Sequence, residues 1–141
     1  MANVKDVAEY ILGKTGSISA MKLQKLVYYS QAWALVWDDE PLFDSRIEAW
    51  ANGPVSPILY NAHRGQFKVT TVGGKAGKLS EEQTDTIDKV IEYYNDKTAQ
   101  YLSDLTHEES PWKDARKDIP DGVRSDQEIT KAAMAEYYGS L

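Results

Sequence analysis

The stretch SAMKLQKLVYYSQAWALVW, residues 19–37, decides the fold of this chain. At helical spacing its apolar side chains line one face, and tyrosine, alanine, leucine and valine make most of the opposite face apolar as well. A helix of this kind, with its few polar groups near its start, is expected to be buried toward its end. Ser19 can cap the start, because its hydroxyl can accept a hydrogen bond from a backbone amide that has no helical partner. The apolar face comprises Leu23, Leu26, Val27, Ala34 and Trp37, with Ser30 inside it and Trp33 at its edge.

Length and composition limit what else the chain can be. With 141 residues it is long enough for one domain with a core and too short for two ordinary ones, so we expect a single domain over 1–141. The absence of cysteine excludes disulfides, thiol catalysis and zinc–thiolate sites. The first residues carry charges and no long apolar run, which argues against a signal peptide. We therefore expect a cytoplasmic protein without a membrane span.

The charge is negative and unevenly placed. The net charge is −6; residues 1–70 carry seven Lys and Arg against seven Asp and Glu, whereas residues 71–141 carry nine against fifteen. Phosphate contacts by basic residues supply most of the affinity of proteins for nucleic acids. Direct binding to nucleic acid is therefore not expected.

The rest of the chain reads mainly as helices. The pattern of apolar residues, turn residues and capping boxes predicts six more of them. The final one is expected to open on a capping box formed by Ser125 and Glu128. The predicted helices are one with Val4, Val7, Ala8, Ile11 and Leu12 inward that ends at Gly13 to Gly16, a short one from Pro57 to before Gly65, helices over 81–95, 97–107 and 111–117, and the last one with Ile129, Ala133 and Tyr137 inward.

Two short segments favour strands. Arg46 to Trp50 alternates charged and apolar residues, and Phe67 to Val72 is rich in β-branched residues. We expect these segments to form a two- or three-stranded patch together. The predicted fold class is mainly α: a single compact helical domain around a buried central helix, with a small β element.

No catalytic, cofactor or metal site stands out. The two histidines, His63 and His107, lie near predicted helix ends, where the helix dipole stabilises a cationic imidazole, so a structural role explains them. The chain has no HExxH, GxSxG, P-loop or dinucleotide motif. The acidic turn at 38–40 could in principle bind a divalent cation, but its spacing does not match a calcium loop and solvated acids explain it better. We expect no enzyme activity, no cofactor and no metal.

An acidic stripe is the first feature that suggests a partner. On the helix predicted over 81–95, the residues Glu81, Asp85, Asp88 and Glu92 follow one another at helical spacing. Like charges placed in this way destabilise a helix by about 0.2–0.5 kcal/mol per pair. The stripe is either a solvated face that supports solubility or a docking surface for a basic partner protein.

A surplus of tyrosine and tryptophan is the second feature. The chain has nine Tyr and four Trp against two Phe. Such side chains suit interface anchors, because they join a large apolar body to a polar group, and they equally suit the half-buried rim of a small core. Trp37 and Phe43, on either side of the acidic turn, are the predicted exposed anchors.

Three segments in register resemble the Panacea domain family, which includes SocA-like antitoxins and phage-associated proteins. They are MKLQKLVYYSQAWALVW, EPLFDSRIEAWANGPVSPILY and THEESPWKDAR, and together they span residues 21–116. Many relatives have a histidine after the tryptophan of the central helix, where this chain has Ala34, so no role of that group carries over. The motif residues that the resemblance singles out are Trp33, Trp50, Gly53, Pro54, Tyr60, His107, Pro111, Trp112 and Arg116, interpreted as fold determinants first and partner contacts second.

The resemblance implies a compact, mostly helical antitoxin that binds a cognate protein toxin encoded nearby and neutralises it by direct contact. It leaves an alternative open, because a SocA-like member works as a proteolytic adaptor that delivers its toxin to a protease. A third hypothesis is an enzyme whose chemistry the sequence does not advertise, which His63 and His107 would have to serve.

Overall fold

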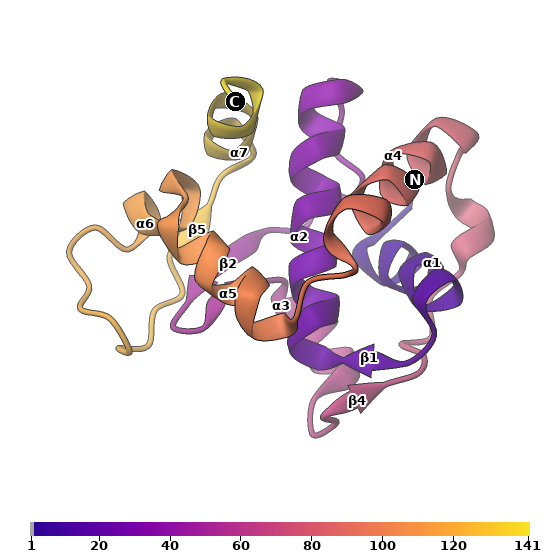
Figure 1. The fold of residues 1–141 in the computed structure, drawn as a ribbon, viewed down its shortest axis with the longest axis horizontal. Coiled ribbons are helices and arrows are strands. Elements are labelled where there is room, and N and C mark those ends of the chain that lie inside the picture. The colour runs from indigo at the N-terminus through magenta and orange to yellow at the C-terminus, as the bar shows by residue number, and fades with distance from the viewer. Residues whose placement is uncertain (1) are drawn as a thin grey trace.

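The computed structural model describes residues 2–141 and confirms the central helix. Helix α2 (Ala20–Trp37) stands in the middle of the molecule (Figure 1), and the Ser19 hydroxyl caps it by accepting a hydrogen bond from the Lys22 amide over 3.1 Å. Burial is deepest in its middle, and Trp37 at its end is 49% exposed. The expected burial toward the end is therefore wrong. The last turn of α2 rises past α4 (Figure 1), and Trp37 on this turn is left half-exposed.

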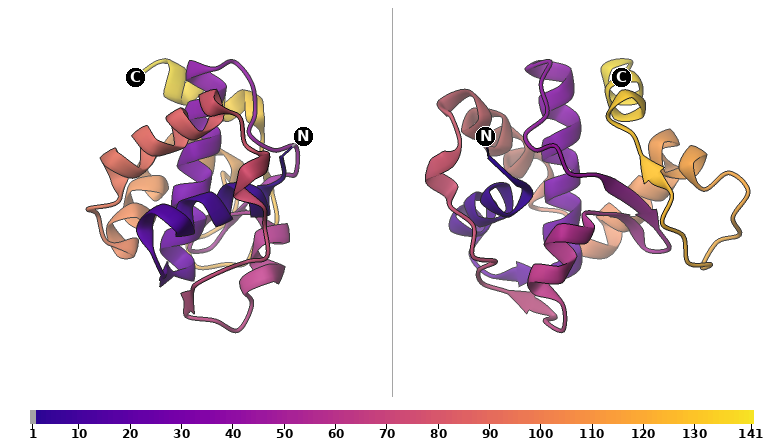
Figure 2. Two further views of the ribbon diagram at one scale, coloured as in Figure 1. Left: turned by 90° about the vertical axis from the view of Figure 1, so that its right-hand side faces the viewer. Right: turned by 180° about the vertical axis from the view of Figure 1, so that it is seen from behind.

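Helices surround α2 on both sides, which confirms the mainly helical fold class. In Figure 1, α1 and α4 lie to one side of α2, and α5, α6 and α7 lie to the other; Figure 2 shows α3 beside the lower end of α2 from behind. The bounds are α1 (Val4–Thr15), α3 (Pro57–His63), the 3₁₀ helix η1 (Ala76–Lys78), α4 (Glu81–Tyr94), α5 (Ala99–Glu108), α6 (Ser110–Ala115) and α7 (Lys131–Gly139).

Three polar residues of α2 are buried because each of them binds the backbone of a crossing segment. The Gln24 side chain accepts a hydrogen bond from the Ser56 amide at 2.9 Å and donates to its carbonyl at 3.2 Å. One helical step further, the Lys25 ammonium donates to the Pro54 carbonyl. The Gln31 amide donates to the Phe43 carbonyl at 2.8 Å and its oxygen accepts from the Leu42 amide. These contacts satisfy polar groups that would be costly to bury unpaired, so α2 can be covered on all sides.

The strands pair differently from the prediction. β2 (Ile47–Trp50) lies between β3 (Gly53–Val55) and β5 (Glu128–Ile129), whereas β4 (Lys68–Val69) pairs with β1 (Ile18–Ser19) in a separate two-stranded sheet. The expected patch between residues 46–50 and 67–72 is therefore wrong. β2 pairs with β3 because a tight turn joins these two neighbouring strands. β4 pairs instead with β1, the segment that leads into α2.

The C-terminal helix begins later than predicted. Glu128 and Ile129 form β5, because the Ala49 amide donates to the Gln127 carbonyl and draws this segment onto β2. Helix α7 starts at Lys131 with Thr130 as its cap, so the predicted capping box of Ser125 and Glu128 is wrong. The shift changes the inward face, which is made by Met134 and Tyr138, while Ala133 and Tyr137 are only half-buried.

Candidate functional site

Two depressions lie at opposite ends of α2. The first, which we call the Lys25 pocket, has a volume of about 780 Å³ and opens near the start of α2. The second, which we call the Trp37 groove, has a volume of about 750 Å³ and lies near its end. Within residues 2–141 no helix is long and apolar enough to cross a membrane, and no group of His, Asp and Glu side chains is placed to hold a metal ion. The two depressions are the candidate functional sites.

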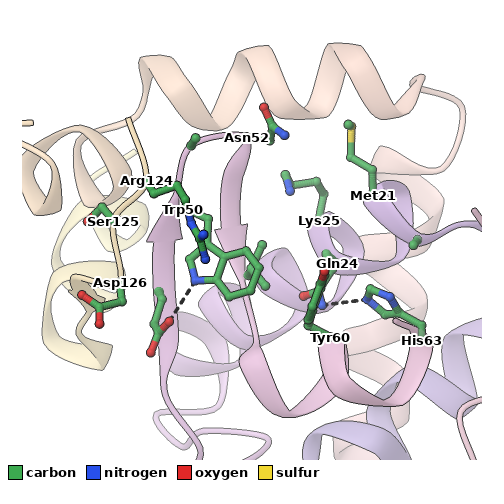
Figure 3. Close-up of a pocket in the computed structure, with 14 residues that line it drawn as sticks. Met21, Gln24, Lys25, Trp50, Asn52, Tyr60, His63, Arg124, Ser125 and Asp126 are labelled. Carbon is green, nitrogen blue, oxygen red and sulfur yellow. Dashed lines mark hydrogen bonds between the residues drawn. The ribbon is translucent and has the colours of Figure 1, made fainter. Parts of the chain in front are cut away.

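Lys25 is one of the residues that line its pocket, and Figure 3 shows it between Asn52 and Gln24. The side chain is 1% exposed, and its ammonium donates to the Pro54 carbonyl over a long 3.3 Å. None of the ion pairs within residues 2–141 includes Lys25. Because burial disfavours the charged form, it lowers the pKa of Lys25 to about 8. A buried ammonium without an acidic partner is costly, so this residue needs an explanation beyond the fold.

The turn between β2 and β3 leaves room for this ammonium. Gly53 has φ +124°, and a Cβ there would lie 2.5 Å from Lys25 Cε and 3.0 Å from its Nζ. The motif Asn-Gly-Pro therefore needs glycine for two reasons. The backbone has a positive φ, and a Cβ at this position would collide with the Lys25 side chain.

Gly53→Ala is expected to destabilise the protein by about 2 kcal/mol or more, because the new methyl group meets Lys25 and the backbone is strained. Gly77→Ala is the matched control, since Gly77 has no positive φ and no atom within 4 Å of the added Cβ. Urea denaturation of both variants measures the difference. Equal stabilities would contradict the close packing of Gly53 on Lys25.

Aromatic and imidazole rings form the wall of the Lys25 pocket (Figure 3). Trp50 and Tyr60 meet edge to face at 5.0 Å, and Tyr60 meets His63 at 5.5 Å. The Gln24 amide donates to His63 Nε2 at 3.0 Å, so the ring carries its proton on Nδ1 and is neutral. Burial lowers the pKa of His63, which keeps it neutral and outweighs the expected stabilisation of a cation by the helix end.

The rim of the pocket carries both charges. Within residues 2–141 the side chains of Arg124, Asn52 and Tyr60 make no hydrogen bond to the protein, so their donors are available to a ligand. Glu48 is engaged, because it accepts from the Trp50 indole at 2.8 Å and pairs with Arg46 at 3.1 Å. The acids on this rim are Glu48 and Asp126.

The motif residues in α5, in α6 and directly after α6 brace the strand that carries Trp50. His107 stacks on Trp112 at 3.9 Å, and the Arg116 guanidinium lies 5.1 Å from the centre of the same ring. The Trp112 indole donates to the Trp50 carbonyl at 2.9 Å, and Arg116 donates to the Ala49 carbonyl at 3.1 Å. Burial, followed by the nearby Lys25 charge, lowers the pKa of His107. These contacts support the interpretation of the motif as a fold determinant; His63 and His107 do not face a common cleft with a reacting group.

The Trp37 groove contains one of the two predicted anchors. Trp37 is 49% exposed as expected, stacks on Trp33 at 5.0 Å and has Lys89 at 5.8 Å. Tyr93 is 67% exposed in the same groove. Phe43 is fully buried, so its predicted exposure is wrong: the hydrogen bonds from Gln31 hold its backbone against α2 and turn its ring into the core.

The acidic stripe is only partly free. Glu81, Asp85 and Glu92 are exposed, and Glu92 also lines the Trp37 groove. Asp88 accepts a hydrogen bond from the Tyr10 hydroxyl at 2.7 Å and lies 3.8 Å from the Lys14 ammonium. Part of the repulsion along α4 is therefore offset by contacts with α1.

The sequence prediction missed Lys25, Gln24 and Arg124 as pocket residues. A signal for the first two was present, because polar residues in a helix that is apolar on every side must have buried partners. Nothing in the sequence brings Arg124 to the pocket, since its position depends on the pairing of β5 with β2.

Comparisons with known proteins agree with the resemblance seen in the sequence. The family described as "Antitoxin SocA-like, Panacea domain" matches residues 23–113. The curated protein Antitoxin SocA of Caulobacter vibrioides (strain NA1000 / CB15N) is 37% identical over 62 residues, which is 41% of this chain and 33% of that protein. The match thus spans about a third of the length of that relative. No solved structure matches the chain significantly.

Proposed function

This chain belongs to the SocA-like Panacea domain family of antitoxins, and from this membership we propose that it neutralises a cognate protein toxin by direct protein–protein contact. The observation that carries the proposal is the extent of the family match. Residues 23–113 include most of α2, both strands of the β2–β3 hairpin, and all of α3, α4 and α5. The gene for the toxin is expected to lie next to the gene for this chain.

The Trp37 groove and the exposed part of the acidic stripe form the proposed contact surface. Trp37 and Tyr93 offer large half-exposed aromatic side chains, which are the residues most often dominant in protein interfaces. Glu92 joins the groove to Asp85 and Glu81 on α4. An aromatic centre beside an acidic rim fits a partner with an apolar patch flanked by basic residues.

Co-expression tests the proposal. The neighbouring open reading frame is expected to stop growth when it is expressed alone and to be tolerated when this chain is present. The purified pair should form a stable complex. A neighbouring product that is harmless, or one whose toxicity this chain does not relieve, would sink the proposed antitoxin function.

The same experiment separates inhibition from delivery to a protease. If the chain inhibits by occupancy, rescue persists in protease-deficient cells and the half-life of the toxin is unchanged. If the chain is an adaptor, the half-life of the toxin shortens when this chain is present and rescue fails without the protease. We propose the first mechanism, and the adaptor is the alternative that the second result would establish.

Charge reversal tests the stripe. Asp85→Lys with Glu92→Lys is expected to slow association with the toxin about tenfold at low salt, with a smaller effect at high salt, because exposed charges act mainly on the encounter rate and are screened. Asp88 is left intact, since it holds Tyr10. The control is Asp118→Lys with Asp121→Lys, in the exposed loop after α6 on the other side of the molecule (Figure 1). Stopped-flow rates that match the wild type would retire the stripe as a docking surface.

A further inference from the structure

The Lys25 pocket contains a positive charge that forms no ion pair within residues 2–141. An ammonium has three N–H donors, and Lys25 uses one of them, over 3.3 Å, on the Pro54 carbonyl. Although it is only 1% exposed, Lys25 lines the pocket, so a ligand that enters lies next to it. An unpartnered buried cation that lines a cavity indicates a ligand with a negatively charged oxygen.

Several uncommitted groups around the cavity can donate as well. The side chains of Arg124, Asn52 and Tyr60 line the pocket without a hydrogen bond to residues 2–141, and each of them can donate. Gln24 has no capacity left, because both of its polar atoms are engaged by Ser56 and His63. The pocket therefore combines the two cationic groups of Lys25 and Arg124 with further free donors that can hold an anion, while Asp126 is an acidic group on its rim.

The remaining residues limit the ligand to a single charge and a flat shape. Glu48 and Asp126 on the rim would repel a second negative charge, which disfavours a phosphate dianion. Trp50 and Tyr60 offer aromatic surface in the same pocket as the ammonium (Figure 3), and the volume of about 780 Å³ lies in the range of small-molecule sites. A carboxylate on a planar, largely apolar group satisfies both conditions.

We propose that the Lys25 pocket is a binding site for a carboxylate attached to a planar apolar group, with the carboxylate oxygens on Lys25 and Arg124 and the planar group against Trp50 and Tyr60. This carboxylate comes either from a free organic acid or from a segment of a protein partner that places Asp or Glu beside an aromatic residue. The pocket lies at the opposite end of α2 from the Trp37 groove, so this site is separate from the proposed toxin surface.

Benzoate and benzamide form a matched pair of probes, since they share the ring and differ in the charge. Titration of the wild-type chain is followed by NMR through the indole N–H resonance of Trp50. Benzoate is expected to shift this resonance saturably and to bind about tenfold more tightly than benzamide, because only benzoate can pair with the ammonium. Inorganic phosphate is expected to bind more weakly than benzoate. Equal affinities for benzoate and benzamide, or no saturable shift, would overturn the proposal.

Lys25→Met is expected to weaken benzoate binding about tenfold, to the level of benzamide. Lys22→Met is the matched control: it removes the same charge from the same helix, but the Lys22 ammonium donates to the Asn95 carbonyl at 2.6 Å and does not line the pocket. Lys22→Met should bind benzoate as the wild type does. Undiminished benzoate binding by Lys25→Met would also overturn the proposal.

A second arm identifies the source of the carboxylate, and this arm alone rests on the proposed antitoxin function. If the acid belongs to the toxin, Lys25→Met weakens the complex with the toxin and benzoate competes with the toxin for the chain. If the acid is a free molecule, Lys25→Met loses benzoate and keeps the toxin. Failure of the antitoxin function leaves the benzoate titration unaffected, so the two failures can be told apart.

Discussion

Lys25→Met is expected to raise the free energy of unfolding at pH 7 by about 2 kcal/mol. The pKa of Lys25 falls from 10.5 to about 8 on folding, which corresponds to about 3 kcal/mol of penalty on the charged form at neutral pH. Methionine has a similar length and no charge, so it removes the penalty. The loss of the hydrogen bond to Pro54 reduces this gain in stability by about 1 kcal/mol.

The gain depends on pH in a defined direction. Between the folded pKa of about 8 and the unfolded value of 10.5, the unfolded chain binds more protons at Lys25 than the folded chain. Stability of the wild type therefore rises with pH in this window, as far as Lys25 determines it. The advantage of Lys25→Met is full below pH 8 and is lost as the pH approaches 10.5.

Urea denaturation at pH 7 and at pH 10 measures both effects, with Lys22→Met as the control that removes an equal charge. Lys22→Met should show no such gain, since Lys22 is only partly buried and has a short hydrogen bond to Asn95. His63 and His107 have lowered pKa values and stay neutral across this range, so they do not confuse the reading. A Lys25→Met variant that is less stable than the wild type at both pH values would contradict the account.

A residue that costs stability where it stands is a functional candidate, because stability is often traded against activity at functional positions. Lys25 meets this description, and so does the glycine that makes room for it. The prediction of higher stability and the prediction of lost benzoate binding concern the same substitution. Together they distinguish a binding residue from one that only holds β3 against α2. If Lys25 had only this structural role, its replacement would lower the stability of the protein.

The sequence predicts those parts of the fold that local chemistry decides. Ser19, Ser80 with Gln83, and Pro57 begin helices where they were expected, because a cap or a proline acts on its own neighbours. The partner of a short strand depends instead on distant contacts. Ser125 and Glu128 have the spacing of a capping box, yet Glu128 pairs with β2 as part of β5.

The same limit applies to the candidate site. Periodicity identifies α2 as buried, but it cannot say which backbone groups Gln24, Lys25 and Gln31 will bind, since these lie in loops that fold back from elsewhere. Phe43 follows a polar turn and was expected to be exposed for that reason. Its burial depends on Gln31, a residue twelve positions earlier.

A second large effect is expected at Glu109, which joins three helices. Its carboxylate is 8% exposed and accepts hydrogen bonds from the hydroxyls of Tyr29 on α2 and Tyr138 on α7, both at 2.7 Å. The Tyr138 hydroxyl lies 3.1 Å from that of Tyr28 in a further hydrogen bond. Burial raises the pKa of Glu109, and the two tyrosine hydroxyls offset part of this rise. Within residues 2–141 these two hydroxyls have no other acidic acceptor, so the network depends on this one side chain.

Glu109→Leu is expected to lower the free energy of unfolding by about 3 kcal/mol, because it leaves buried tyrosine hydroxyls unpaired, each at a cost of about 1–3 kcal/mol. Glu109→Gln keeps an acceptor oxygen and should cost about 1 kcal/mol or less. The folded state holds the Glu109 proton to higher pH than the unfolded state, so stability from this group falls as the pH rises through the folded pKa. Glu109→Gln, which cannot ionise, should therefore compare best with the wild type at neutral pH and worst in acid.

Glu108→Leu is the control, since Glu108 is the exposed neighbour of Glu109 and should change stability by no more than about 0.5 kcal/mol. Urea denaturation of the three variants, followed by near-ultraviolet circular dichroism of the tyrosines, measures the effect. The order of stability should be Glu108→Leu, then Glu109→Gln, then Glu109→Leu. If Glu109→Leu were as stable as Glu109→Gln, apolar packing of α7 on α2 would be holding this end of the molecule, and the tyrosine hydroxyls would contribute little.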